Sequence, residues 1–523
     1  MKHFLKALLL LLFGCNVTLM VQAQTISYKV NLGNHKDLNK VVADQLEVTV
    51  NVEALGRNEL TFAMPAMVPG IYAKLDFGRL VSGISAQSVA GPAEVIKTST
   101  NTWQIRGWAP IKSISYWVDD SWDDCRQVEQ PTPVYRSAGS CFIADSAFLI
   151  NANAVFGYVV GAEKSPLVLN LTAPTEMLPV SGLKAKATTV GKALTTWQLK
   201  APNYRTFVDN PILVAAPDTT SFHVGNLRVM IAGFSRGGLK SAATLASVIE
   251  PLVQAQAKYL GGTLQVDRYT FLNYHELHHD TNEYYYDGLE HGQSTLIINK
   301  IANRPSVIKR QAFAVANHEF YHILMPLNLH SRSIEDYDFL NPAPSAHLWL
   351  YEGMTEYFTW HTRLSQHLDT PTQSLEGLSS YIRQASRFDS TQSLWQMSLK
   401  ASTRQDQYMN FYAKGPLLCL MLDLELIKSS NGLWNNRKLV AALTKHFGPT
   451  GTFEEGELFS TIAQITKLPH LRQWLTDYIV ENKPLPLQRY LSLIGLEIKA
   501  NQTVVMVEKA GAEQVGLYGV WGR

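Results

Sequence analysis

The chain has 523 residues, of which 46% are hydrophobic and 17% are charged, a composition typical of a folded protein with two or three domains. Lysine and arginine together number 46, against 44 for aspartate and glutamate, and the sequence contains no basic run. This charge balance excludes the electrostatic signature of a protein that binds nucleic acid or an anionic membrane surface.

Residues 1–23 have the pattern of an export signal. Lys2 and Lys6 give a basic start, "ALLLLLFG" an apolar centre, and "VQA" a small-residue cleavage site before Gln24. A membrane anchor is one alternative, although the apolar stretch is short for a span. Lipid attachment at Cys15 is another. We expect an exported, periplasmic protein whose mature chain has equal numbers of basic and acidic residues and no transmembrane segment.

Two cysteines flank a turn-rich stretch of the predicted mature chain. Cys125 and Cys141 bracket "RQVEQPTPVYRSAGS", and an exported protein meets an oxidising compartment. We therefore predict a Cys125–Cys141 disulfide, with two free thiols as the alternative. Cys419 lies in an apolar run and is expected in the core.

Short alternating runs separated by Gly, Pro and Asn fill residues 24–215 and predict a β-sandwich-like domain. The predicted strands include residues 25–32, 45–52, 59–65, 101–107 and 113–120.

The pattern changes after about residue 216. Residues 242–260 have helical periodicity, residues 268–277 read as a strand, and helices are expected from about 305 to 480. A short strand-like tail follows "ENKPLPLQ". The sequence thus predicts an α+β multidomain protein, a β domain followed by a mainly helical one.

One helix, predicted over residues 307–324, carries the sequence "HEFYH". His318 and His322 are four residues apart, so their side chains share one helical face and can bind one metal ion. Glu319 lies beside them, where it can take a proton from an attacking water. The alternative is a helix that carries two partly buried histidines.

A catalytic zinc site needs a third protein ligand. Glu352 follows His322 after 29 residues, enough for a loop and an adjacent helix. Glu356 lies one turn further along that helix, where it can orient a histidine from outside the ligand set. A solvated carboxylate is the alternative for Glu356. Gly353 is unfavourable inside a helix, and a close approach of two helices would explain it.

"HEFYH", 29 residues, and then "LWLYEGMTEYF" resemble the glycyl aminopeptidase family of gluzincin zinc metallopeptidases. "MPAMVPGIY" at 64–72 is similar to the family's amino-domain signature, with Met67 where tryptophan is usual. The resemblance implies an amino-terminal β domain (24–215), a thermolysin-like zinc peptidase domain (216–483) and a PDZ domain. We expect residues 484–523 to form a partial PDZ-like tail.

Two further segments resemble substrate-handling parts of that family. "YYDGLEHGQST" at 285–295 is similar to an edge segment that runs along the substrate. There the resemblance implies that Glu290 grips the amino group, Gly288 allows backbone approach, and His291 belongs to the substrate site. A loop carboxylate in water is the alternative for Glu290, and a residue that supports the loop is the alternative for His291. "FYAKGPLLCLMLD" at 411–423 is similar to a helix start in which Tyr412 donates a hydrogen bond to the developing oxyanion.

The resemblance implies an exported zinc aminopeptidase with one zinc per chain, which hydrolyses the first bond of peptides and prefers glycine or alanine at the amino end. Two alternatives stay open. One is a zinc endopeptidase with the same chemistry, and the other is a non-catalytic peptide-binding protein on a peptidase scaffold. The sequence does not indicate an oligomeric state.

Overall fold

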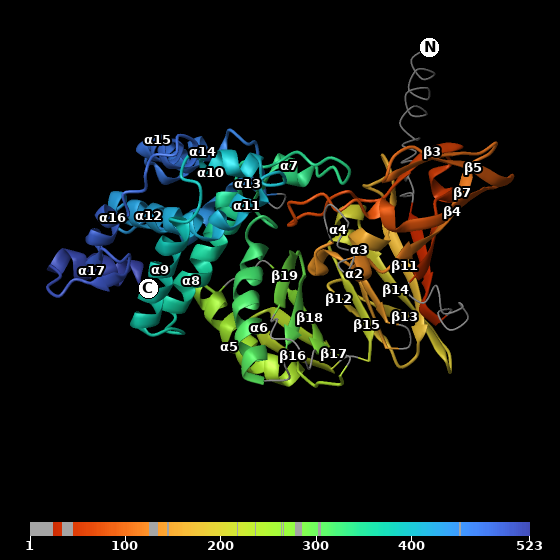
Figure 1. The fold of residues 1–523 in the computed structure, drawn as a ribbon, viewed down its shortest axis with the longest axis horizontal. Coiled ribbons are helices and arrows are strands. Elements are labelled where there is room, and N and C mark those ends of the chain that lie inside the picture. Colours follow the sequence, from red (N-terminus) through yellow and green to blue (C-terminus); the bar gives the residue numbers. More distant parts are fainter. Residues whose placement is uncertain are drawn as a thin grey trace, which may run out of the picture.

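The computed structural model describes residues 25–33, 45–124, 134–143, 146–216, 218–235, 237–262, 264, 266–277, 285–301, 305–448 and 451–523. The predicted signal (1–23), with Cys15, and Cys125 lie outside the described residues. Along the long axis of the molecule, a β-rich part is followed by a smaller sheet and then by a body of helices (Figure 1).

A large sheet dominates the β-rich part. Strand β1 (Ile26–Asn31) pairs in parallel with β11 (Leu167–Pro174) and antiparallel with β2 (Gln45–Asn51). On β11, buried and half-buried residues alternate, as expected for a strand with one face in the core. The described strands follow the order β10 (Tyr158–Val159), β3 (Glu59–Ala63), β6 (Thr102–Arg106), β5 (Gly91–Lys97), β4 (Val81–Ser88), β7 (Ile111–Asp119), β2 (Gln45–Asn51), β1 (Ile26–Asn31), β11 (Leu167–Pro174), β14 (Leu194–Ala201) and β13 (Lys186–Val190).

A second, smaller sheet joins the β-rich part to the rest of the molecule. Its described strands follow the order β12 (Leu178–Ser181), β15 (Ile212–Ala215), β9 (Ala147–Ile150) and β8 (Cys141–Ile143). Leu149 and Leu213 of this sheet share a buried apolar cluster with Phe234 and Leu272 of the next sheet. The two sheets therefore pack face to face through a common core.

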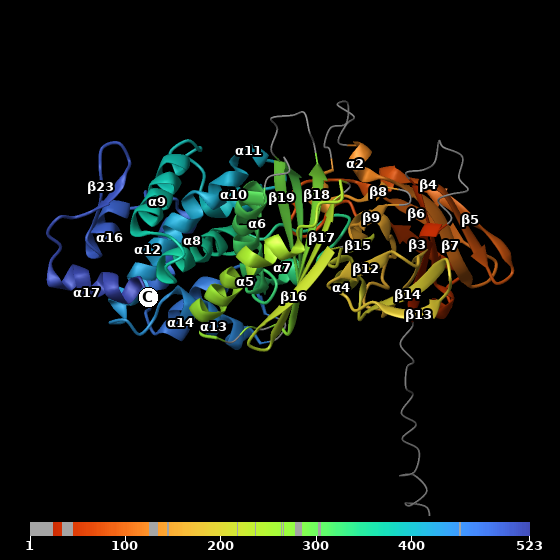
Figure 2. The same cartoon turned by 90° about the horizontal axis from the view of Figure 1, so that it is seen from below.

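The third sheet carries the strand nearest the candidate site. Its described strands follow the order β16 (Asp218–Val224), β17 (Leu227–Ser235), β18 (Arg268–Leu277), β20 (Ser294–Ile301) and β19 (Tyr285–His291). Strands β17, β18 and β20 are parallel, whereas β19 pairs antiparallel with β20 and forms the edge. Helices α5 (Ala242–Tyr259) and α6 (Pro305–Glu319) contact this sheet, as Figure 2 shows.

Helices make up most of the remaining chain. Helix α12 (Lys414–Ser429) has an almost entirely buried apolar sequence and packs against both α8 (Thr355–Ser365) and α9 (Pro371–Ala385). Other described helices include α2 (Ser121–Asp124), α3 (Ala152–Val155), α4 (Tyr204–Val208), α7 (Arg332–Glu335), α10 (Leu394–Leu399), α11 (Gln405–Tyr408), α13 (Asn436–Phe447), α14 (Leu458–Thr466) and α15 (His470–Leu475). Two short strands, β21 (His330–Ser331) and β22 (Thr452–Phe453), pair in parallel. None of the described helices is both long and apolar enough to cross a membrane.

The C-terminal segment packs onto the helical body. It consists of α16 (Leu487–Leu493), a hairpin of β23 (Leu496–Ile498) and β24 (Val504–Met506), and α17 (Ala512–Trp521). Leu496 and Trp521 belong to the same buried cluster as the helices around α12. This segment therefore shares its core with the helical body.

The predicted fold class is confirmed, since a large β-rich domain precedes a mainly helical region. The predicted strands at 25–32, 45–52, 59–65, 101–107, 113–120 and 268–277 correspond to β1, β2, β3, β6, β7 and β18. The helix predicted over 242–260 is α5, which accommodates Pro251 inside it.

Candidate active site

Two histidines converge at the end of α6. The helix ends at Glu319, and a 3₁₀ turn over Phe320–Ile323 continues the chain without a break in direction. The Nε2 atoms of His318 and His322 lie 3.2 Å apart, as the four-residue spacing predicts. Both imidazoles are almost fully buried, with His318 only 9% exposed.

The other nitrogen of each ring faces a hydrogen-bond acceptor. His318 Nδ1 lies 2.8 Å from Glu356 Oε2, and His322 Nδ1 lies 3.0 Å from the carbonyl oxygen of Met325. An acceptor at Nδ1 fixes the proton there and leaves Nε2 with a free lone pair. The two lone pairs then point into one small space, the arrangement that a metal ion requires.

Glu352 completes this group. Its Oε2 lies 3.5 Å from His318 Nε2 and 3.7 Å from His322 Nε2. Ligand atoms about 2.0–2.2 Å from a tetrahedral zinc ion lie roughly 3.3–3.5 Å apart. The separations of these three atoms fit a zinc ion, and two imidazoles with one carboxylate are a donor set that catalytic zinc uses.

A local widening of the helix presents Glu352. Residues Trp349–Met354 form a π-helical turn ahead of α8, where the sequence pattern predicted a continuous helix. Such turns are often found at functional sites because they change the direction of a side chain. Here the turn allows Glu352 and Glu356 to contact opposite nitrogens of the same residue, His318.

Gly353 has the packing role that its position in a helix predicts. A Cβ atom on Gly353 would lie 2.8 Å from the Cα atom of Gly415, and one on Gly415 would lie 2.7 Å from the Cα atom of Gly353. The π-helical turn and the start of α12 therefore touch backbone to backbone. This contact brings Tyr412, just before α12, close to Glu352.

Tyr412 lies beside His318 and Glu352. Its hydroxyl lies 2.7 Å from Glu352 Oε2, and its ring centre lies 5.2 Å from that of His318. The hydroxyl of Tyr408 lies 3.4 Å from that of Tyr412 and 3.4 Å from Glu352 Oε1. The predicted oxyanion donor is thus adjacent to His318, His322 and Glu352, the predicted metal-ligand group.

Glu319 faces the same space from the floor of the cleft. A Cβ atom on Gly288 of β19 would lie 2.9 Å from Glu319 Oε1 and 2.5 Å from Val315 Cγ1. Only glycine permits this approach of the edge strand to the carboxylate. The contact is with side chains of α6, and the predicted approach of a substrate backbone to Gly288 stays a prediction.

Glu290 reaches the cleft from the same strand. Its carboxylate forms a group with Glu319 and His322 in which the polar atoms lie within 4.8 Å of one another. Among the described residues, no lysine, arginine or histidine forms an ion pair with Glu290. His291 lies on the opposite face of β19, as strand alternation requires, with Nδ1 3.2 Å from Asp209 Oδ1.

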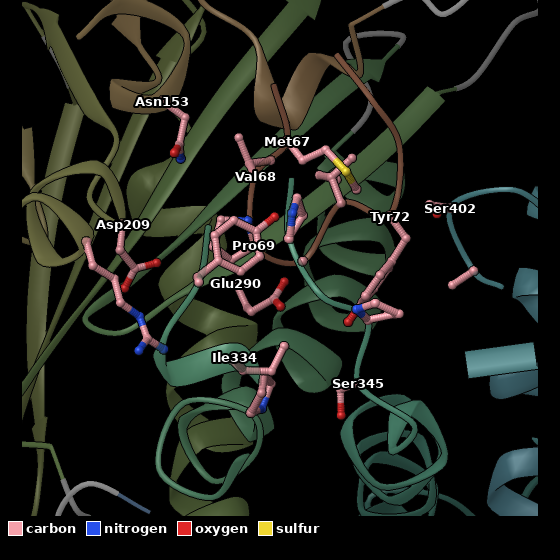
Figure 3. Close-up of a pocket in the computed structure, with 18 of the residues that line it drawn as sticks. Met67, Val68, Pro69, Tyr72, Asn153, Asp209, Glu290, Ile334, Ser345 and Ser402 are labelled. Atoms are coloured by element: carbon pink, nitrogen blue, oxygen red, sulfur yellow. The ribbon is translucent and has the colours of Figure 1, made fainter. Parts of the chain in front are cut away.

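Two hollows meet at Glu290. One is the cleft of about 660 Å³ that contains both histidines, Glu319, Glu352 and Tyr412. The other is a more enclosed cavity of about 120 Å³. Figure 3 shows this cavity, with Glu290 beside Met67, Pro69 and Tyr72 of the loop that follows β3. The "MPAMVPGIY" segment therefore contributes one wall of the candidate site.

Burial governs the proton affinities in the cleft. It raises the pKa of Glu319 well above its usual value, with His318 lowering it and Glu290 and Glu352 raising it further. Burial also raises the pKa of Glu290, which His322 lowers and Glu352 raises. Burial and then Glu352 raise the pKa of Tyr412, so its hydroxyl stays a donor near neutral pH. Carboxylates crowded in this way favour the binding of cations.

Sequence reasoning missed two tyrosines. Tyr408 contacts Tyr412 and Glu352, and its position one helical turn before Tyr412 could have indicated it. Tyr381 donates from its hydroxyl to Glu356 Oε1 at 2.6 Å. It lies 25 residues further along the chain on a separate helix, and no local pattern points to it.

The predicted Cys125–Cys141 disulfide involves Cys125, which lies outside the described residues. Cys141 is buried on β8, and its Sγ lies 3.8 Å from the hydroxyl of Tyr274. Cys419 is buried in α12, as its apolar surroundings predict. The Cys125–Cys141 bridge stays a prediction.

The fold is shared with solved structures. An aminopeptidase N family protein from Idiomarina loihiensis aligns with 91% of this chain and 79% of its own, at 20% identity and a TM-score of 0.74. An M1 zinc metallopeptidase from Deinococcus radiodurans aligns with 89% of this chain and 95% of its own, at 13% identity and a TM-score of 0.55. A mutant of that enzyme, at 12% identity and also a TM-score of 0.55 over 89% of this chain and 95% of its own, is bound to a Tyr-Ser-Ala substrate.

Sequence comparison identifies the family. Residues 35–216 match the peptidase M61 N-terminal domain, and residues 311–418 match the M61 glycyl aminopeptidase family. No curated protein shows significant similarity to the chain. The chain belongs to the M61 glycyl aminopeptidase family and is a zinc metallopeptidase of the aminopeptidase class.

Proposed function

We propose that this protein is an exported aminopeptidase that hydrolyses the first peptide bond of peptides, with one zinc ion per chain. His318, His322 and Glu352 would hold the metal. Glu319, Tyr412 and Glu290 would act on the substrate, with Gly288 beside it.

The proposal rests mainly on the surroundings of the Glu290 carboxylate. It is a half-buried carboxylate, and no cationic side chain among the described residues pairs with it. A free peptide amino group is a cation near neutral pH and would supply the missing partner. An internal segment of a peptide has no such charge. Glu290 therefore favours a substrate that enters by its amino end.

Each residue would have a distinct part in the reaction. Zinc, when bound, supplies Lewis-acid chemistry that activates water and polarises a carbonyl group. Glu319 takes a proton from the attacking water and passes it to the leaving amine. Tyr412 donates its hydroxyl hydrogen bond to the carbonyl oxygen as negative charge develops there. Glu290 pairs with the amino group and so fixes which bond is cleaved.

Two finer parts of the proposal rest on the sequence alone. The preference for glycine or alanine as first residue rests on the resemblance to glycyl aminopeptidases. Export to the periplasm rests on the basic, apolar and small-residue segments of residues 1–23.

Metal analysis of the purified protein, together with a peptide panel, tests the proposal. We expect about one zinc per chain and stepwise release of single residues from free peptides, fastest from glycine and alanine termini. Peptides with an acetylated amino group should resist cleavage. Rapid internal cleavage of acetylated peptides would instead establish an endopeptidase. A protein with neither zinc nor activity would fit the non-catalytic alternative.

A further inference from the structure

The two histidines of the metal-ligand group are held in different ways. His322 Nδ1 faces the backbone carbonyl oxygen of Met325 at 3.0 Å. A backbone carbonyl within a folded turn has a fixed direction. His318 Nδ1 faces a side chain, the Glu356 carboxylate, at 2.8 Å. A glutamate has several rotatable bonds, so its carboxylate fixes the histidine ring only if something fixes the carboxylate.

Tyr381 provides that second contact. Its hydroxyl donates to Glu356 Oε1 at 2.6 Å, while Glu356 Oε2 accepts from His318. Both oxygens of one carboxylate are then engaged, by residues from two different helices. Hydrogen bonds to a carboxylate are stronger than those between neutral groups, so the phenol is suited to hold the carboxylate plane.

Helix α9 carries Tyr381 and is itself firmly placed. It starts with a capping box, in which the Thr370 hydroxyl accepts from the backbone N–H of Gln373. Trp360 of α8 donates from its indole N–H to the carbonyl oxygen of Ser374 at 3.0 Å. Figure 1 shows α8 and α9 side by side.

The C-terminal segment contacts both helices. The backbone N–H of Val504 on β24 donates to the hydroxyl of Ser379 on α9 at 2.9 Å. The indole N–H of Trp521 donates to the hydroxyl of Tyr357, the residue next to Glu356, at 3.0 Å. Hence the helices that carry Tyr381 and Glu356 both form hydrogen bonds with the C-terminal segment.

We propose that Tyr381 is a positioning residue of the metal site, whose hydroxyl fixes the Glu356 carboxylate and thereby keeps Nε2 of His318 directed toward His322 and Glu352. The inference rests on the ligand set in the proposed function. Tyr381 touches neither metal nor substrate. It acts by limiting the orientations of one ligand before the metal arrives.

Zinc affinity of the Tyr381→Phe variant tests this role. The substitution keeps the ring and removes only the hydroxyl. Loss of outer partners of metal ligands typically weakens metal binding 10–100-fold. We expect at least a tenfold higher zinc Kd, measured by chelator competition, with little change in the thermal unfolding of the metal-free protein. The visible spectrum of the cobalt-substituted variant should also change, because the His318 ligand moves.

Tyr478→Phe is the matched control. Tyr478 is half-buried against Trp474, and its hydroxyl has no hydrogen-bond partner among the described residues. We expect its zinc Kd and cobalt spectrum to match those of the unmodified protein. In a Glu356→Gln background, Tyr381→Phe should add less than about a twofold further loss, because both changes act on one contact.

Zinc content of the unmodified protein and the zinc Kd of Tyr381→Phe test two different things. Absence of zinc from the unmodified protein would defeat the proposed ligand set, and this inference with it. An unchanged zinc Kd in Tyr381→Phe, in a protein that does bind zinc, would overturn the role of Tyr381 alone. So would an equal loss with and without Glu356→Gln.

Discussion

The metal-ligand group and Glu290 lie in one cleft, but they differ in whether the chain supplies partners for their polar atoms. His318 and His322 each have a partner at Nδ1, and Glu352 accepts a hydrogen bond from Tyr412. Glu290 has no ion-pair partner among the described residues. The metal-ligand group is therefore held by contacts within the chain. Glu290 lacks a cationic partner, which a ligand can supply. We infer that the fold sets the relative positions of His318, His322 and Glu352, whereas a bound substrate would supply the cation that Glu290 lacks.

The largest effect is expected from Glu319→Gln, which removes the proposed base without removing a metal ligand. Proton transfer by a positioned group typically contributes 10²–10⁴-fold, so turnover should fall by about a thousandfold or more. Zinc content, measured by elemental analysis, should stay the same. Glu376→Gln on the exposed face of α9 is the matched control and should leave turnover unchanged. A loss of zinc in Glu319→Gln would show that Glu319 also supports metal binding. That result would contradict its assignment as a base outside the ligand set.

Tyr412→Phe should have the next largest effect. The change removes a hydrogen bond aimed at charge that develops in the transition state, and such donors contribute about a hundredfold or more to turnover. We expect kcat to fall by about that factor while KM changes little, measured by steady-state kinetics. An unchanged kcat would place Tyr412 with the structural tyrosines of the core.

Gly353→Ala tests whether the fold sets the metal geometry. The added methyl group would meet the Gly415 backbone at 2.8 Å and push the π-helical turn away from α12. Overpacking of this kind costs about 1–3 kcal/mol of unfolding free energy, measurable by denaturant titration. Zinc affinity should fall as well, because Glu352 is the neighbouring residue.

Gly516→Ala in α17 is the control for this variant, since no other atom lies within 4 Å of an added Cβ there. It should be neutral or slightly stabilising. Gly353→Ala with unchanged stability and zinc affinity would show that the helix contact does not position the ligand.

Glu290→Gln should have the smallest effect, a change in stability. Glu290→Gln replaces a carboxylate that lacks an ion-pair partner with a neutral group of the same shape. In the zinc-free protein without peptide, we expect the free energy of unfolding to rise by roughly 1 kcal/mol. Glu276→Gln on β18 should lower it, because Glu276 is paired with Arg136. A loss of stability in Glu290→Gln would mean that the chain itself satisfies this charge.

Local patterns in the sequence predicted most residues of the proposed metal site. The four-residue spacing of His318 and His322 determines their relative position on one helix. Glu352 and the close contact at Gly353 followed from the second helix. The π-helical turn was not predictable, because its residues have an ordinary helical pattern. Tyr381 depends on the packing of α9 against α8, a contact between helices that no local pattern encodes.

The substrate side depended more on resemblance than on local physics. No periodicity or spacing points to Glu290, since a carboxylate on an edge strand usually faces solvent. The surroundings of Glu290 are set by tertiary structure. The loop after β3 lies against it, and α6 brings Glu319 near. The division of the chain at residues 216 and 484, the PDZ-like nature of the tail and the substrate role of His291 stay predictions.

Acetylation of the peptide amino group tests the proposed role of Glu290. The specificity constant is determined for a short peptide with a free and with an acetylated amino group, using the unmodified enzyme and Glu290→Gln. If Glu290 binds the amino group, acetylation should cost the unmodified enzyme at least about a hundredfold, because a charge-assisted contact is lost and Glu290 is left unpaired. The same acetylation should cost the variant only a few-fold. Equal losses in both proteins would contradict the account, since the amino group would then be recognised elsewhere.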